Sequence, residues 1–494
     1  MKTAKMTLAL LLSALMCLAI LPVGAMAKLV PGREIYSGTC GESLTWTLDT
    51  STGVLDIIGS GAMQNYSSTG APWNSHANEV LYINIGEAVT TIGNAAFWGC
   101  SQVTSIVIPD SVTRIGKNAF EYCTVLSSVI LGNSVSELGA SIFGGCYALV
   151  SIDLPASVET IDSGTFRGCH SLEAINTASD NPYFKSLDGI LLTKDGSTLL
   201  CFPCGKDCDY TIPSGVIRIG DYSFYGCELL HSVHIPEGVA AIGRYAFQLC
   251  TAMQSVNIPS SVTEIGFAAF YSCRSLTSIV IPGSITVIPR SAFINCSGLT
   301  SVTLPENLEG IGKQAFWSCS SLTEITFPDS LQYLGELSFN NCASLSSATF
   351  LGGKPLLWEP DDYKFVSDPD SSAPYPARGG DDELPVFYGC APDFRVYYTA
   401  SHASEWAPNG ETYWYDYYDY DPYPIYMIPD PQPVLPGDVD GNGSVNANDA
   451  LTVLRAALGL VDEVGSEGDV NGDGVVNAND ALMILRAALG LITF

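Results

Sequence analysis

The chain has 494 residues, with 51 acidic and 21 basic side chains, a formal net charge of −30, and 16 cysteines. This length exceeds one ordinary domain, so we expect several units or a repeat array. A hydrophobic content of 47% excludes a mostly disordered chain. The acidic excess argues against binding to nucleic acid or to anionic lipid, because both require clustered Lys and Arg.

Residues 1–27 have the pattern of a secretory signal peptide. Lys2 and Lys5 precede an uncharged apolar run, and small residues follow it at the cleavage positions, in Ala25-Met26-Ala27. The run approaches the length of a membrane span, so an uncleaved anchor helix is the alternative. With cleavage, we expect a secreted, extracellular protein.

A repeat of 23 residues follows. Phe recurs at this spacing in two runs, and each Phe is followed three residues later by Cys. The repeated phenylalanines are Phe97, Phe120, Phe143 and Phe166, then Phe224, Phe247, Phe270, Phe293, Phe316 and Phe339. One repeat plus a 35-residue insertion separates the two runs. A fixed period of this length predicts a solenoid of stacked coils.

The unit at residues 262–284 illustrates the expected coil. Ile279 and Ile281 alternate with Ser278 and Val280, which predicts a short strand with the isoleucines facing inward. The Phe-x-x-Cys segment is expected to form a helical turn that places both side chains on one side. A single coil cannot bury its Phe, so neighbouring coils must stack and form an aromatic spine.

The ten repeated cysteines occupy one position of the coil. We interpret them as buried thiols that act as small hydrophobic side chains. Disulfides between adjacent coils are the alternative, although parallel side chains give poor S–S geometry. Cys40 and Cys390 lie outside the repeat. Cys201, Cys204 and Cys208 have no evident fourth zinc ligand, which favours loop thiols or a local disulfide.

The repeat "VTxIGxxAFxxCxxLTSIxIPxS" and the insertion "NPYFKSLDGILLTKDGSTLLCFPCGKDCDYTIP" resemble the BspA-like leucine-rich repeats of bacterial surface proteins. The resemblance covers roughly residues 36–400. It implies an α/β solenoid with β-rich caps, and residues 36–61 resemble the family's N-terminal cap. Within the insertion, Lys194-Asp195-Gly196 lies between two apolar runs and predicts a hairpin turn.

Outward strand positions form a candidate ligand face, because solenoids commonly bind partners on the sheet. These positions are Asp153, Asn176, His234, Asn257, Thr303 and Thr326. A solvated strand face without a ligand is the alternative. The ligand on this face would be a protein or a glycan.

Residues 355–436 are acidic and rich in aromatic side chains. We interpret 355–415 as a C-terminal cap region and 416–436 as a Tyr- and Pro-rich linker. Stacking of the exposed rings on sugars or on a partner is the alternative. The remaining boundaries are a signal peptide at 1–27, a cap with the first repeat strand at 28–88, a solenoid at 89–354 with an insertion at about 177–211, and a C-terminal module at 437–494.

That module contains two copies of a calcium-loop pattern, with oxygen ligands at positions 1, 3, 5, 7, 9 and 12 and Gly at position 6. The first copy supplies Asp438, Asp440, Asn442, the Ser444 carbonyl, Asn446 and Asp449. The second supplies Asp469, Asn471, Asp473, the Val475 carbonyl, Asn477 and Asp480. Position 12 is Asp instead of the usual Glu, so the loop must approach the ion more closely. Each loop runs into a helix with leucines at helical spacing.

Two loop–helix copies without preceding helices resemble a type I dockerin. The resemblance implies a small all-α module that binds two calcium ions and docks onto a cohesin module of a scaffoldin. By position, the cohesin contacts are Ala447, Asn448, Leu454 and Arg455 in the first copy, and Ala478, Asn479, Leu485 and Arg486 in the second. Ala-Asn replaces the family's usual Ser-Thr pair. Because the copies are almost identical, we hypothesise two binding orientations related by 180°.

Motifs for catalysis are few. The sequence has no HExxH, no nucleophile elbow and no phosphate-binding glycine loop. His231 and His234 could approach a metal, but the ordinary interpretation is polar surface residues. Three functions remain: a non-catalytic binding or adhesion subunit of a cellulosome-like complex, an enzyme with an unrecognised active site, or a structural spacer. We favour the first.

Overall fold

The computed structural model describes residues 34–357, 385–408, 410–414, 423–430, 437, 439, 445–458, 468–471, 476–489 and 491. The predicted signal peptide and most of the predicted linker lie outside these residues. The chain divides into two compact units, Met1–Gln254 and Ser255–Phe494, which are described separately below. Within the described residues, no helix is both long and apolar enough to cross a membrane.

The first unit begins with the expected β-rich cap. Strands β1 (Ile35–Thr39), β2 (Leu44–Asp49) and β3 (Val54–Gly59) form an antiparallel meander, and β5 (Tyr82–Ile85) adds to β3 in parallel. A short 3-10 helix, η1 (Asn74–Glu79), precedes β5. Alternate residues of β2 are buried because one face of the meander covers the first coil.

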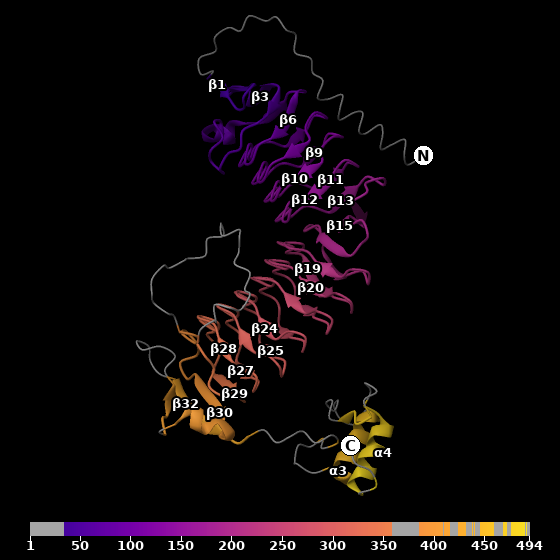
Figure 1. Cartoon of the computed structure of the whole chain (residues 1–494), viewed down its shortest axis with the longest axis vertical. Helices are drawn as coiled ribbons and strands as arrows, with labels where there is room; N and C mark the ends of the chain where they lie inside the picture. Colours follow the sequence, from indigo (N-terminus) through magenta and orange to yellow (C-terminus); the bar gives the residue numbers. More distant parts are fainter. Residues whose placement is uncertain are drawn as a thin grey trace, which may run out of the picture. The chain divides into compact units, whose positions relative to one another are not determined.

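The following coils of the first unit contribute longer strands on one side and shorter strands on another, and strands of successive coils pair in parallel (Figure 1). The longer strands are β7 (Ser105–Val107), β9 (Ser128–Ile130), β11 (Ser151–Leu154), β13 (Ala174–Thr177), β17 (Cys208–Thr211) and β19 (Leu230–His234). The shorter strands are β4 (Gly61–Ala62), β6 (Val89–Ile92), β8 (Arg114–Ile115), β10 (Glu137–Leu138), β12 (Thr160–Ile161), β18 (Arg218–Ile219) and β20 (Ala241–Ile242). Ser105 pairs with Ser128 and Ser151 with Ala174, so the strand register equals the 23-residue period.

The insertion forms an antiparallel hairpin with an extra strand. Strands β14 (Phe184–Leu187), β15 (Ile190–Thr193) and β16 (Thr198–Cys201) pair in this order. Gly196 adopts a φ of 83°, which a residue with a Cβ rarely adopts, at the turn between β15 and β16. The hairpin turn predicted at Lys194-Asp195-Gly196 is therefore confirmed.

The second unit repeats the same coil (Figure 1). Its longer strands are β21 (Ser255–Asn257), β23 (Ser278–Val280), β25 (Ser301–Thr303), β27 (Glu324–Phe327) and β29 (Ser347–Phe350). Its shorter strands are β22 (Glu264–Ile265), β24 (Val287–Ile288), β26 (Gly310–Ile311) and β28 (Tyr333–Leu334). As predicted, Ile279 and Ile281 are buried, while Ser278 and Val280 are exposed.

A five-stranded sheet ends this solenoid segment. Strands β30 (Arg395–Thr399), β32 (Tyr423–Ile428) and β31 (Tyr413–Trp414) follow β29 in the sheet order. The short helices η2 (Ala400–His402) and α2 (Ala403–Trp406) cover it, and Trp406 and Trp414 are buried against one another. Trp414 is therefore part of the packed end of this solenoid segment.

The Phe-x-x-Cys segment is a pair of tight turns and not the helical turn expected from its spacing. Residues two before and two after the Phe have left-handed backbone conformations, as Asn118 and Tyr122 do around Phe120. This conformation turns alternate N–H groups toward the next coil: the Phe120 N–H donates to the Ile142 carbonyl at 2.9 Å. A helix would consume these N–H groups internally, whereas the turns use them to join coils.

The predicted aromatic spine is present in both units. Consecutive rings of the repeat stack with centroids 4.8 to 5.9 Å apart, and all are buried. Three further rings, which the period alone did not reveal, extend the stacks: Trp73 on Phe97, Phe202 on Phe224, and Phe387 on Phe339. Phe387 opens Phe387-Tyr388-Gly389-Cys390, a further copy of the repeat turn within the predicted cap region.

All cysteines of the described residues are free thiols, and the repeated ones are buried. In seven coils the thiol hydrogen donates to the carbonyl oxygen of the Phe one coil earlier, with S···O distances of 3.1 to 3.3 Å. Cys therefore suits this position as a small side chain that also carries a weak donor. Burial raises the pKa of Cys100 to about 12, so the thiol stays protonated at neutral pH.

Candidate functional sites

The C-terminal module consists of two helices, α3 (Ala447–Ala457) and α4 (Ala478–Ala488), and each begins immediately after a predicted calcium loop. Asn446 and Asn477 are their N-caps. Each Asn side chain accepts a hydrogen bond from a backbone N–H of the first turn, and the carboxylate of the Asp three residues later accepts one from the N-cap backbone N–H. This reciprocal capping box fixes where the helix starts relative to the loop.

Asp449, the predicted position-12 ligand of the first loop, is completely buried. Its Oδ1 accepts the Val439 N–H at 2.9 Å and its Oδ2 accepts the Asn446 N–H at 2.8 Å. The carboxylate thereby joins the beginning of the loop to its end. Carboxylate and amide oxygens are the donors that calcium prefers, so the side chains described here fit this ion.

The second loop has a similar arrangement, in which the first donor lies one loop position later. Asp480 is also completely buried, and its two oxygens accept the Asn471 and Asn477 N–H groups at 3.3 and 2.9 Å. Asp469 is partly buried. The other predicted ligands, Asp438, Asp440, Asn442, Ser444, Asp473 and Val475, lie outside the described residues. Among the residues that the structure does describe, no cluster of three or more His, Cys, Asp or Glu side chains is arranged to hold a metal.

Small and branched side chains form the core between α3 and α4. Ala450, Val453, Ala481 and Ile484 are buried together, with partly buried valines packed around them. The leucines at helical spacing are not in this core. Leu451, Leu454 and Leu458 on α3 and Leu482, Leu485 and Leu489 on α4 are exposed. Exposed leucines on two adjacent helices are typical of a surface that a partner covers.

The eight predicted cohesin contacts are all exposed and lie at matching places on the two helices. Ala447, Asn448, Ala478 and Asn479 occupy the first turns, and Arg455 and Arg486 the last turns. Leu454 and Leu485 are each 37% exposed. The two copies therefore present nearly the same surface, which is the condition for the predicted pair of binding orientations.

The six residues of the candidate ligand face are all exposed on the longer strands, as the alternation predicted. In the first unit, the Asn176 amide donates to the Asp153 carboxylate at 2.8 Å across adjacent coils. His234 is exposed at the end of β19. Asn257, Thr303 and Thr326 have the same placement on β21, β25 and β27 of the second unit. Whether a ligand uses them remains a prediction.

The two histidines considered as metal ligands have ordinary surroundings. His231 lies 2.8 Å from the Asp207 carboxylate, and both side chains are largely exposed. Among the thiols of the insertion, Cys204 is buried, with its Sγ 3.6 Å from the Sγ of the repeat cysteine Cys227. Cys204 therefore packs beside the row of repeated cysteines, called the cysteine ladder below.

Stacked coils of 23 residues, with one Phe and one Cys at fixed places in each coil, define a leucine-rich repeat protein. The twin loop–helix module is a separate interaction domain. Family comparison agrees: six copies of the "BspA type Leucine rich repeat region" match residues 76–187, 202–322 and 263–353, and the "Dockerin type I domain" matches residues 436–489. The repeat matches cover more than half of the chain. The chain therefore belongs to the BspA-type leucine-rich repeat family and carries a type I dockerin, a calcium-binding domain whose partner is a cohesin.

Comparison with solved structures finds similar leucine-rich repeat chains. A leucine-rich repeat protein from Eubacterium ventriosum is 26% identical, with a TM-score of 0.50, over 60% of this chain and 92% of that chain. A leucine rich cell surface protein from Faecalibacterium prausnitzii is 22% identical, with a TM-score of 0.42, over 66% of this chain and 97% of that one. A leucine-rich repeat protein from Bacteroides ovatus is 22% identical, with a TM-score of 0.42, over 78% of this chain and 99% of that chain. A search of curated proteins finds no match.

Proposed function

We propose that this protein is a secreted, non-catalytic binding subunit that attaches to the cohesin of a scaffoldin through its dockerin. The assembly would be a cellulosome-like complex that degrades polysaccharides. The solenoid would carry the binding or adhesion surface, and the dockerin would place that surface within the complex. One observation carries the proposal: two adjacent helices, each capped at the end of a predicted calcium loop, expose matching leucine and arginine side chains.

The dockerin residues divide into two roles. Asp449 and Asp480 hold the two ends of each loop together through their carboxylate oxygens, and the capping boxes fix the first turn of each helix. Two bound calcium ions would supply positive charge that balances the acidic loops. Loops that are held in one conformation by calcium fix the positions of Leu454 and Leu485 on their helices. Cohesin binding therefore depends on calcium.

Arg455 and Arg486 give the dockerin surface its polar component. Each lies in the last turn of its helix, where a cation also favours the helix dipole. A leucine beside an arginine matches a partner patch with an apolar centre and acidic or carbonyl acceptors around it. We infer that the cohesin supplies such a patch.

For the solenoid we propose binding on the longer-strand face, which includes Asp153 and Asn176. The support is a row of exposed polar side chains held by a rigid sheet, with adjacent coils hydrogen-bonded at the surface. Polar groups fixed in advance on strands lose little conformational entropy when a ligand binds.

The first test is capture of the full-length protein on immobilised type I cohesins, with calcium and with a chelator. Calcium-dependent capture is expected. A variant in which Leu454, Arg455, Leu485 and Arg486 are all replaced by Ala should lose capture, whereas Val280→Ala on the exposed solenoid surface should retain it. Capture that is unchanged by the chelator or by the fourfold variant would refute the dockerin role.

The second test concerns the solenoid. Fragment 28–430, which keeps the whole sheet that ends the solenoid, is placed on a glycan array, used for pulldown from culture supernatant, and assayed for polysaccharide hydrolysis. We expect a ligand and no hydrolysis. The double variant Asp153→Ala/Asn176→Ala should bind that ligand more weakly. Hydrolysis would favour the enzyme hypothesis, and the absence of any ligand would favour the spacer.

A further inference from the structure

The shorter-strand sheet of the first unit is interrupted at the insertion. Strands β4, β6, β8, β10 and β12 form one continuous sheet that ends at β12. The next shorter strand along the chain, β18, pairs with β16 of the hairpin and not with β12. The coil that carries β12 therefore lacks the neighbour that every preceding coil has on this side.

The interruption leaves main-chain groups without their usual partners. In earlier coils the Phe N–H donates to the next coil, as Phe120 does to Ile142 and Phe143 to Thr165, both at 2.9 Å. For the Phe166 N–H, no acceptor is found among the described residues. A buried N–H without a partner costs free energy, so it is a place where a ligand group gains by binding.

On the same edge of this coil, a main-chain carbonyl also lacks its usual hydrogen-bond donor. The carbonyls of Ile115 and Leu138 accept N–H groups from the following coil, at 3.0 and 2.9 Å. The equivalent Ile161 carbonyl has no such donor within the part of the chain that the structure describes. The edge of this coil therefore offers one main-chain donor, at Phe166, and one main-chain acceptor, at Ile161.

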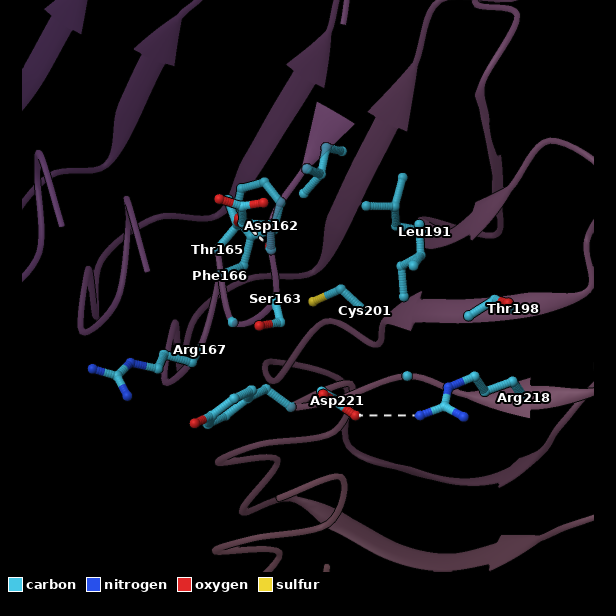
Figure 2. Close-up of a pocket in the computed structure, with 15 residues that line it drawn as sticks. Asp162, Ser163, Thr165, Phe166, Arg167, Leu191, Thr198, Cys201, Arg218 and Asp221 are labelled. Atoms are coloured by element: carbon cyan, nitrogen blue, oxygen red, sulfur yellow. Dashed lines mark hydrogen bonds and ion pairs between the residues drawn. The ribbon is translucent and has the colours of Figure 1, made fainter. Parts of the chain in front are cut away.

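Ile161 and Phe166 both line a cavity of about 250 Å³, in the space that the next coil would fill. Leu191, Leu200 and Phe166 form its apolar part, and Tyr222 adds an aromatic ring. Figure 2 shows the Asp162–Phe166 segment and Leu191 on one side and Arg218 and Asp221 on the other, with Cys201 between them. All of these residues belong to the first unit.

The charged side chains around the cavity are mostly neutralised. Arg167 pairs with Glu121 at 2.6 Å, and Arg218 lies 3.7 Å from Asp221. Asp162 is exposed at the rim. The cavity therefore has no surplus cation for a phosphate or carboxylate, but it does have a carboxylate that can accept hydrogen bonds from hydroxyl groups.

We propose that this cavity binds one neutral, hydroxyl-rich ring, a single sugar residue, either free or at the end of a glycan. Hydroxyl groups both donate and accept, so adjacent hydroxyls match the Phe166 N–H, the Ile161 carbonyl and the Asp162 carboxylate. The C–H face of the ring packs on Leu200 and Tyr222, which are only partly buried. The volume is below the usual range of drug-sized pockets, which limits the ligand to about one ring.

This site differs from the longer-strand face and does not depend on the dockerin. It is lined by the shorter strands and turns, and Asp153 and Asn176 are not among its residues. A failure of cohesin capture, or of ligand binding to the longer-strand face, would leave this inference untouched.

The test titrates the full chain, in calcium, with D-glucose, D-galactose, D-mannose, D-xylose and L-arabinose and their common disaccharides, by calorimetry and ligand-observed NMR. Saturable binding of at least one sugar is expected. Leu200→Trp fills the cavity and should abolish binding, whereas Val107→Trp on the exposed face should not. Asp162→Asn should weaken binding roughly tenfold by removing a charge-assisted acceptor. Glu159→Gln, the same charge change outside the cavity, is its control.

Hydrogen exchange tests the donor directly and does not depend on any variant folding. Added sugar should slow exchange of the Phe166 amide and leave the Phe143 amide unchanged, because the latter is already bonded to Thr165. The proposal is overturned if no sugar in the panel binds, if binding survives Leu200→Trp in a folded protein, or if Phe166 exchange is unaffected. Binding of free amines or amino acids in place of sugars would overturn the ligand class.

Discussion

Phe120 and Phe166 are a matched pair for measuring what aromatic stacking contributes to the solenoid. Both are repeat positions of the first unit, and both side chains are at most 2% exposed. Phe120 stacks between Phe97 and Phe143, at 5.2 and 5.8 Å. Among the described rings, Phe166 stacks only on Phe143, at 5.9 Å, because the insertion displaces the next coil.

Replacement of either Phe by Ala leaves a large cavity and should cost about 3–5 kcal/mol of unfolding free energy. Phe120→Ala removes two ring pairs and Phe166→Ala removes one. Since an aromatic pair contributes about 0.5–1.5 kcal/mol beyond its buried area, Phe120→Ala should be more destabilising by about that amount. The collapse of neighbours into the existing cavity beside Phe166 would act in the same direction.

Urea unfolding of the full chain followed by circular dichroism gives the overall effect. Native-state hydrogen exchange at the amides of each coil gives the local one, because repeat arrays need not unfold in two states. Val107→Ala, on an exposed strand position, is the control and should change stability by about 0.5 kcal/mol or less. Equal costs for the two Phe variants, or a larger cost at Phe166, would refute the stacking argument.

Three further predictions follow from the same structure. Chelation of calcium should unfold α3 and α4 and leave the β signal of the solenoid intact; a loss of both together would contradict independent folding of the dockerin. The cysteine ladder should make the solenoid sensitive to alkali. The pKa of Cys100 is raised from 9.0 to about 12 in the folded state, so its stabilising contribution is present below pH 9 and is lost as the pH rises toward 12. Urea titrations at several pH values should show this slope, and Cys100→Ala should reduce it. Finally, cohesin binding should survive Leu454→Ala with Arg455→Ala, and also Leu485→Ala with Arg486→Ala, but not all four together. Loss of binding when only one copy is changed would rule out two equivalent orientations.

The periodic parts of the molecule could be predicted because each is a local rule repeated many times. The spacing of Phe and Cys fixed the coil length, and the alternation around Ile279 fixed which side faces inward. Gly196 within a polar turn fixed the hairpin. The helical turn was the exception: a Phe and a Cys three residues apart suit either a helix or a tight turn. The tight turn forms because it directs N–H groups toward the next coil, where they make hydrogen bonds that join the two coils.

The additional spine members were harder to recognise. Phe387 and Cys390 lie 48 residues after the previous pair, and their turn sequence Phe-Tyr-Gly-Cys repeats that of Phe224–Cys227. That match was the available signal. Trp73 and Phe202 carry no such signal, because neither has a Cys three residues later, and only stacking identifies them.

By itself, the sequence determined the repeat, the caps, the two calcium-loop patterns and the family resemblances, because each depends on residues close together in the chain. Only the tertiary structure decided which leucines of the dockerin face solvent, since a helical stripe does not say which side its partner helix covers. It also located the cavity at Ile161 and Phe166. That cavity arises from a neighbouring coil displaced by the insertion, and no local pattern records whether a coil has a neighbour.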